Sequence, residues 1–210
     1  TSAGQGGAGR PLRNIFRSPV VILAVCCAGL GYGIMSFIMT ATPISMHVHA
    51  GHSLDSTKFV IQSHIAAMYL PALLYPWLQG RLGYRGMLWL GVLVYAGCLL
   101  IALFDTAFLN YWGALILLGI GWNFLFLSGT NLLPMGYRSE ERFRVQSAND
   151  FIVFLVQALV SLSAGWFLYR FQWEGIILAC LPLLGAFTLL LWLGPKRFTG
   201  ESWNRQGGRD

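Results

Sequence analysis

The hexapeptide RLGYRG at residues 81–86 recurs in altered form as RFQWEG at residues 170–175, 89 positions further along the chain. Both copies follow one pattern: Arg, an apolar residue, any residue, an aromatic residue, a charged residue and Gly. Each copy separates two long stretches that contain no Asp, Glu, Lys or Arg. The pattern therefore predicts that two related units follow one another, and the uncharged stretches indicate what kind of unit each is.

Charged residues are too few to cover a soluble protein. The 210 residues include 14 Lys and Arg and 8 Asp and Glu, which is 10% of the chain, against about 25% in soluble domains. Hydrophobic residues make up 56% of the chain, and the mean hydropathy is +0.60. A bilayer removes the need for a polar exterior and penalises charge. This composition excludes an ordinary soluble domain and indicates a membrane protein.

Six uncharged stretches are each long enough for a transmembrane helix, which takes about 18–20 residues. We predict an all-α polytopic membrane protein whose six helices have apolar cores at about 19–42, 58–78, 87–104, 111–133, 149–169 and 175–194. Residues 1–17 are expected to form a cytoplasmic linker, 18–194 the six-helix bundle, and 195–210 a cytoplasmic tail. The glycine-rich start, with no initiator Met, predicts that the chain continues something larger.

A second match supports the duplication. Gly31-x-Gly33 recurs as Gly119-x-Gly121, 88 positions later, with a Thr or Ser at matching places further on. Agreement between the two offsets predicts a unit of three helices. An odd number of helices forces the second unit to cross the membrane in the opposite direction, which makes an inverted repeat. The alternative is chance, because Gly and Arg are common near the ends of membrane helices.

Lys and Arg are divided unequally between alternate loops. With a cytoplasmic N-terminus, the other side of the membrane receives only Lys58 and Arg170. Positive residues concentrate on the cytoplasmic side of membrane proteins. Both termini are therefore predicted to be cytoplasmic. The cytoplasmic side then carries Arg10, Arg13, Arg17, Arg81, Arg85, Arg138, Arg142, Arg144, Lys196, Arg197, Arg205 and Arg209.

Polar residues follow one face of the first, second, fourth and fifth predicted helices, whereas the third and sixth are almost wholly apolar. Polar side chains at membrane depth are costly unless they meet one another or line a watery cavity. We predict a substrate pathway between the four polar helices. The alternative is that the polar groups only join helices by hydrogen bonds. The predicted pathway residues are Tyr32, Ser36, Thr40, Gln62, His64, Asn123 and Gln157.

Two titratable residues are candidates for proton coupling. Asp150 lies near the start of the fifth predicted helix, where desolvation would favour its protonated form. The alternative is an Asp at the membrane boundary, solvated or paired with Arg142 or Arg144. His64 could carry a proton or donate to substrate, although a structural histidine bonded to a neighbouring helix is also consistent with its position.

Three histidines, His47, His49 and His52, lie together in the loop after the first predicted helix. Imidazoles this close could capture a divalent metal, but the pattern has no Cys or nearby Glu, and a solvated loop is the preferred interpretation. Trp122 could stack on a ring-bearing substrate, or could serve only for packing.

The chain resembles the C-terminal six-helix half of transporters of the major facilitator superfamily. In that superfamily each half consists of inverted three-helix repeats, and the third and sixth helices face lipid. The loop signature of the superfamily normally has an acidic residue after its first glycine, which is absent here, so the gating role of that acid is not carried over. The resemblance covers about residues 11–198 and rests on segments 10–19 (RPLRNIFRSP), 80–86 (GRLGYRG), 137–142 (YRSEER), 121–126 (GWNFLF) and 146–151 (QSANDF).

The resemblance implies secondary active transport of a small solute by alternating access in a bacterial inner membrane, by symport or antiport, with protons as the favoured coupling ion. Its partner would be an N-terminal six-helix half, on the same polypeptide or on a separate chain. The alternatives are a non-transporting membrane scaffold or assembly factor that binds a protein or a pigment, and a six-helix carrier that pairs with itself. The sequence offers no serine-protease motif, no histidine pair for haem and no phosphate-binding loop, so neither an enzyme nor a cofactor is expected. The basic residues form no single patch for nucleic acid.

Overall fold

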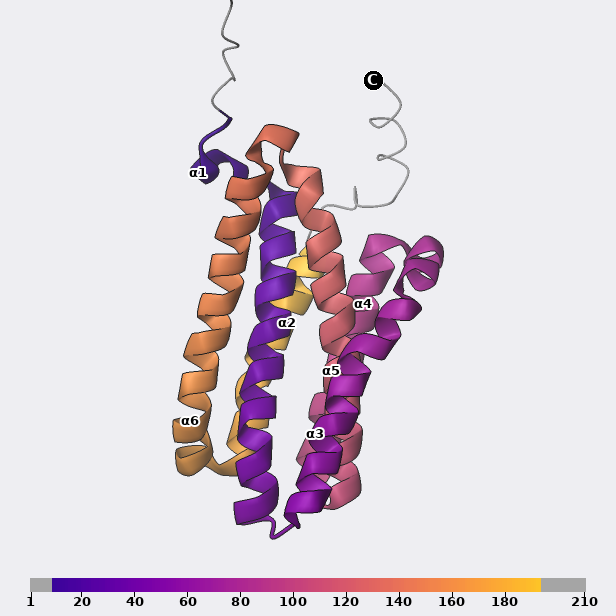
Figure 1. The fold of residues 1–210 in the computed structure, drawn as a ribbon, viewed down its shortest axis with the longest axis vertical. Helices are drawn as coiled ribbons and strands as arrows, with labels where there is room; N and C mark the ends of the chain where they lie inside the picture. The colour runs from indigo at the N-terminus through magenta and orange to yellow at the C-terminus, as the bar shows by residue number, and fades with distance from the viewer. Residues whose placement is uncertain (1–8, 194–210) are drawn as a thin grey trace, which may run out of the picture.

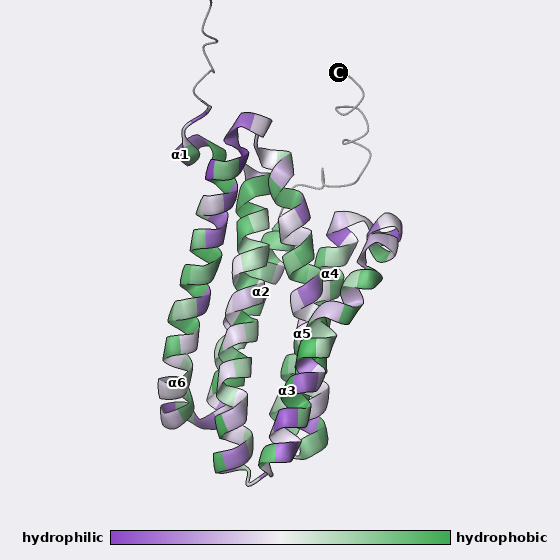
Figure 2. Ribbon diagram, viewed as in Figure 1, coloured by the Kyte–Doolittle hydropathy of each residue, from purple (hydrophilic) through white to green (hydrophobic). Residues whose placement is uncertain are grey.

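A computed structural model describes residues 9–193, which form a bundle of long helices (Figure 1). The bundle has no strand within this range, which confirms the predicted all-α class. Figure 2 shows hydrophobic residues along most of the helices and hydrophilic ones on α3 and at the ends of the bundle. The elements are α1 (Leu12–Ile15), α2 (Pro19–Ile44), the π-helical turn η1 (Ser45–His49), α3 (Leu54–Tyr69), η2 (Leu70–Leu73), α4 (Tyr75–Phe104), α5 (Phe108–Leu132), η3 (Leu133–Gly136), η4 (Ser139–Glu141) and α6 (Arg142–Leu193).

Four helices of the described chain are long and apolar enough to cross a membrane: Pro19–His49, Tyr75–Phe104, Phe108–Gly136 and Ser139–Leu193. The last is 55 residues long, far more than the roughly 20 residues that one crossing needs. α6 changes direction at Gln172, whose backbone is not helical. We therefore divide it into a first arm, residues 142–171, and a second arm, residues 173–193. The predicted total of six crossings stays a prediction, because α3 is not among the four helices.

The two copies of the repeated hexapeptide share one backbone geometry. Gly83, the third residue of the first copy, breaks α4 with a φ of 67° and a ψ of 175°. Gln172, the third residue of the second copy, breaks α6 with a φ of 58° and a ψ of −171°. The final glycine of each copy is also equivalent, because a Cβ on Gly86 would meet the Cβ of Leu82 and one on Gly175 would meet that of Phe171. Each copy thus makes the same turn, which supports the predicted duplication.

The centre of the bundle is α5, which packs against α2, α3 and α4. Small residues bring the helices close together, as is common in membrane proteins. A Cβ on Gly129 would come within 2.8 Å of the Ala24 carbonyl oxygen on α2, and one on Gly121 within 2.7 Å of the Tyr95 ring on α4. The Tyr95 hydroxyl donates a hydrogen bond of 2.8 Å to the carbonyl oxygen of Gly31, which joins α4 to α2.

The N-terminal segment packs against the bundle within the part of the chain that is described. The predicted linker covers residues 1–17, of which 1–8 lie outside the described residues. Residues 9–17 include the short helix α1, whose Ile15 is only 1% exposed. This segment therefore differs from the extended spacer that its glycine-rich start suggests. The predicted tail, residues 195–210, lies outside the described residues.

Replacing Gln172 with Gly should stabilise the protein by about 1 kcal/mol. A non-glycine residue at positive φ with an extended ψ costs about 1–3 kcal/mol, and the greater chain entropy of Gly offsets about 0.5–1 kcal/mol of the relief. Thermal unfolding of the detergent-solubilised protein, followed by tryptophan fluorescence, measures the change. The matched variant Gly83→Gln should lower the unfolding temperature. If Q172G lowered it as well, the two turns would not share the geometry described.

Candidate functional site

A ladder of contacts joins α3 to α5. His64 donates from Nδ1 to the carbonyl oxygen of Leu115 at 2.8 Å, and Asn123 donates from Nδ2 to that of Met68 at 2.7 Å. Between them, a Cβ on Gly119 would come within 2.8 Å of the His64 carbonyl oxygen. Residues 115, 119 and 123 are four apart on α5, so they share one face. His64 and Asn123 are 0% and 2% exposed. This contact favours the structural interpretation of His64, and it occupies the amide nitrogen of Asn123 but not its oxygen.

Three polar atoms near this contact find no hydrogen-bond partner within the described chain: Nε2 of His64, Nε1 of Trp122 and Oδ1 of Asn123. A buried polar atom without a partner costs about 1–3 kcal/mol. Trp122 and Asn123 are neighbours on α5. The Nε1–H of Trp122 needs an acceptor, and the Oδ1 of Asn123 needs a donor. These atoms could therefore bind a polar solute that reaches them.

Five aromatic rings from α2, α3, α5 and α6 form what we name the aromatic cluster: Tyr32, Tyr69, Trp122, Phe126 and Phe154. The Tyr32 ring stands edge-on to Trp122 and to Phe126, with centroids 5.2 Å apart in both pairs, and 6.0 Å from Phe154. Trp122 stacks on Phe126 at 5.0 Å, and Tyr69 lies 6.2 Å from Trp122. Tyr69 is 62% exposed and Phe154 57%. The cluster therefore presents accessible ring surfaces on which another planar ring can stack.

Asp150, on the first arm of α6, lies next to the aromatic cluster in the sequence of that helix. Asp150 is exposed and lies one helical turn before Phe154, on the same face. Its carboxylate accepts a hydrogen bond of 3.1 Å from Asn149, and it forms no ion pair with Arg142 or Arg144. A negative charge therefore lies beside the aromatic rings.

The other predicted pathway residues divide between surface and interior. Thr40 is exposed, and its hydroxyl donates to that of Ser161 on α6 at 3.5 Å. Gln157 is half-buried, Gln62 is exposed and Ser36 is 4% exposed. Thr40 on α2 and Ser161 on α6 are thus side by side. The predicted pathway through all seven residues stays a prediction.

The three loop histidines do not converge. The Nδ1 of His47 bonds the carbonyl oxygen of His52 at 2.9 Å, and the Nε2 of His52 bonds that of Thr106 at 2.8 Å. His49 instead lines a cavity of about 220 Å³ that also includes Glu174. Residues 9–193 hold no group of three or more His, Cys, Asp or Glu side chains that could hold a metal. The exposed backbone contacts of His47 and His52 are consistent with the solvated-loop interpretation.

A buried ion pair holds the N-terminal segment to the loop between α5 and α6. The Arg10 guanidinium donates to both Glu141 oxygens, at 2.9 and 2.7 Å, and the Arg10 backbone NH donates at 2.8 Å. The backbone NH of Arg138 donates to the same carboxylate at 2.9 Å. The Glu141 side chain is 0% exposed. Hydrogen bonds from Arg10 and Arg138 stabilise the carboxylate and lower the pKa of Glu141 to about 2.

Sequence reasoning missed two of these features. Of the aromatic cluster it identified Tyr32 and Trp122 and did not connect them, although the spacing of Trp122 and Phe126 places both rings on one face of α5. It also missed the Arg10–Glu141 pair, whose partners are 131 residues apart. The one signal in the sequence for a structural role of Glu141 was the capping pattern at the start of η4, where Glu141 is the third residue.

Comparison with curated proteins finds relatives in bacteria. The chain is 40% identical over 198 residues to the riboflavin transporter RfnT of Brucella anthropi, a match that covers 92% of this chain and 49% of that protein. It is 35% identical over 160 residues to the uncharacterized MFS-type transporter YdeG of Bacillus subtilis, covering 75% of this chain and 36% of the relative. The MFS-type transporter YddS of the same organism is 39% identical over 124 residues, covering 58% and 28%. No family profile and no solved structure matches the chain.

The apolar helices and these relatives define an integral membrane protein. The chain belongs to the major facilitator superfamily, which confirms the resemblance noted in its motifs. It spans about half the length of the riboflavin transporter, and less of the other two relatives. All three relatives are named as transporters, in agreement with the prediction of a non-enzyme.

Glu141 should make the protein sensitive to acid. Folding lowers its pKa from 4.5 to about 2, so the unfolded chain binds the proton more tightly, and the stabilisation present above pH 4.5 is lost as the pH falls toward about 2. Glu141→Gln should lower the unfolding temperature at neutral pH and flatten its dependence between about pH 5 and about pH 3. The exposed neighbour Glu140→Gln is the matched control. An equal acid dependence in E141Q and E140Q would contradict this role.

Proposed function

We propose that the chain forms one half of a secondary transporter that moves a planar, ring-bearing solute across the membrane by alternating access. The aromatic cluster is the observation that carries the proposal, because it gathers rings from four helices, exposes those of Tyr69 and Phe154, and has a carboxylate beside them. Stacking on aromatic rings suits a flat heterocycle and is tolerant of its substituents. The proposed solute is riboflavin or a similar flavin, since the relative that shares 40% identity is named a riboflavin transporter.

The polar groups around the cluster support such a solute. A flavin carries carbonyl and ring-nitrogen acceptors and an N–H donor on one plane, and recognition requires partners for these groups. Trp122 Nε1 is an unpartnered donor and Asn123 Oδ1 an unpartnered acceptor. We assign them to the edge of the bound ring. Gln62 and Gln157, on α3 and α6, supply further amide groups on the flanking helices.

The coupling ion in this proposal is a proton, and Asp150 is its carrier. Asp150 lies beside the aromatic cluster and is free of an arginine partner within the described residues. We assign His64 to the α3–α5 contact instead, because its ring nitrogen already bonds the Leu115 carbonyl.

The second half of the pathway is proposed to be an N-terminal six-helix unit, on the same polypeptide or on a separate chain. The match to about half of the riboflavin transporter supports this arrangement. The Arg and Lys asymmetry favours cytoplasmic termini, and the bacterial relatives favour the inner membrane.

Removing the exposed rings of the cluster should weaken substrate binding. Tyr69→Leu and Phe154→Leu in the complete transporter should each raise the KM for riboflavin about tenfold, because stacking a base on an aromatic ring contributes about 1–3 kcal/mol. Uptake of radiolabelled riboflavin into proteoliposomes measures this effect. Trp166→Leu is the control, since Trp166 is a similarly exposed ring outside the cluster. If riboflavin were not transported while other flat heterocycles were, the substrate assignment would fail and the pathway assignment would stand.

Neutralising Asp150 should uncouple transport from the proton gradient. Asp150→Asn should abolish accumulation of substrate driven by an imposed pH gradient and preserve exchange of substrate down its own gradient. Proteoliposomes with and without the pH gradient separate the two activities, and Glu140→Gln is the control. Full pH-driven accumulation in D150N would exclude Asp150 as the proton carrier. Lack of any transport by the unaltered protein would instead favour the scaffold alternative.

A further inference from the structure

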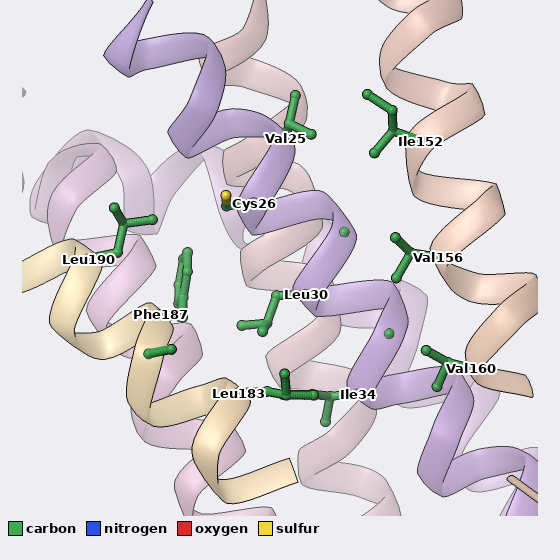
Figure 3. Close-up of a pocket in the computed structure, with 13 residues that line it drawn as sticks. Val25, Cys26, Leu30, Ile34, Ile152, Val156, Val160, Leu183, Phe187 and Leu190 are labelled. Atoms are coloured by element: carbon green, nitrogen blue, oxygen red, sulfur yellow. The ribbon is translucent and has the colours of Figure 1, made fainter. Parts of the chain in front are cut away.

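A cavity of about 500 Å³ lies between α2 and the two arms of α6 (Figure 3). Its thirteen lining residues are all apolar or glycine. In the figure, Val25, Ile152 and Leu190 mark the end nearer the N-terminus of α2, and Ile34, Val160 and Leu183 the other end. The cavity reaches the surface of the bundle, because Leu183 is 50% exposed and Leu190 37%. It is separate from the aromatic cluster, since none of the five cluster rings lines it.

The equivalent contact, between α5 and α4, is filled. At Gly121 a Cβ would come within 2.7 Å of the Tyr95 ring, whereas at Gly33, 88 positions earlier, the nearest neighbour is a Val156 methyl at 3.4 Å. The residue 89 positions after Tyr95 is Leu184, which has no ring to fill the space. Gly29 has no neighbouring atom within 4 Å of its Cβ position. The repeated architecture therefore does not require the cavity, which lies where α2 of the first unit meets α6 of the second.

Only hydrocarbon suits these walls. A polar solute would lose its hydrogen bonds there, and apolar cavities in proteins stay dry and accept apolar molecules. An unfilled cavity of this size would forfeit dispersion contacts along its whole lining. The cavity is formed by helices long and apolar enough to cross the membrane. The abundant hydrocarbon at that depth is the acyl chain of a lipid.

Positive charge lies beyond one end of the cavity. Arg17 lies in the turn before α2, two residues before the helix begins at Pro19. Arg144 precedes Ile152 by eight residues on the first arm of α6, about 12 Å of helix. Both arginines are exposed, and neither has a carboxylate within 4.0 Å in the described chain. The headgroup region of a bilayer lies at about this distance from the middle of its hydrocarbon core. Basic sites between helices recognise anionic lipid headgroups.

We propose that the cavity binds one acyl chain of an anionic phospholipid whose phosphate lies near Arg17 and Arg144. The lipid completes the packing of α2 against the two arms of α6, where the protein alone leaves space. This site is independent of the substrate and of transport, since it shares no residue with the aromatic cluster.

Native mass spectrometry of the complete, detergent-solubilised protein tests the site with palmitoyl-oleoyl phosphatidylglycerol and the corresponding phosphatidylcholine. Phosphatidylglycerol should bind more tightly. Gly29→Phe should weaken its binding about tenfold, as expected when about two methylene groups lose their contacts. The ring can enter the cavity without a backbone clash. Gly185→Phe is the matched control, because Gly185 also has no neighbour within 4 Å and does not line the cavity. Unaltered binding in G29F would overturn the acyl-chain site.

The headgroup is tested separately. The double variant R17Q/R144Q should weaken phosphatidylglycerol binding about tenfold, from about 1 kcal/mol for each basic residue, and leave phosphatidylcholine unchanged. Arg85→Gln removes a charge elsewhere on the same predicted side and should have no effect. Equal affinities for the two lipids would overturn the anionic headgroup. Retention of neither lipid by a folded protein, as judged by its unfolding temperature, would show that another part of the protein covers the cavity.

Discussion

The approach of α5 to its neighbours at backbone distance is the constraint on which the rest of this bundle depends. Helices in lipid gain little from the hydrophobic effect when they associate, so they depend on close packing and on hydrogen bonds. Gly119 and Gly129 bring α5 against the backbones of α3 and α2, and Gly121 receives the Tyr95 ring of α4. Tyr95 in turn bonds the carbonyl of Gly31 on α2. Three helices are thus fixed around α5, and these contacts hold in place the four rings of the aromatic cluster that lie on α2, α3 and α5.

The duplication explains both the symmetry of the bundle and its departures from symmetry. Both hexapeptide copies turn the chain at their third residue, with Gly83 in one and Gln172 in the other. Thr42 and Thr130, 88 positions apart, each donate to the carbonyl oxygen four residues earlier. The units differ in packing, because the α3–α5 crossing has backbone contact at Gly119 whereas α2 leaves a cavity beside Gly29 and Gly33. The two copies therefore share the path of the backbone but differ in how side chains pack between their helices.

The sequence was sufficient for the fold class and the repeat because both depend on local information. Spacing between charged residues reports which segments can enter lipid, and Gly83 lies in a motif whose second copy is visible at a fixed offset. The site depends on which helix faces which, and helical periodicity does not contain that information. The spacing of Tyr32, Ser36 and Thr40 predicts a common face, but not that Thr40 meets Ser161. Similarly, nothing near Arg10 in the sequence points to Glu141, because bundle topology alone brings them together.

The two sides of α2 show why the predicted pathway and the cavity in the structure are different places. Toward one side, Tyr32 and Thr40 meet aromatic and polar partners on the first arm of α6. Toward another, Gly29 and Gly33 face the apolar cavity. The joint between α2 and this arm lacks the backbone-to-backbone approach that Gly119 provides between α5 and α3. Because Asp150 and Phe154 belong to that arm, the charge and the ring proposed to meet the solute lie on a helix that also borders the cavity.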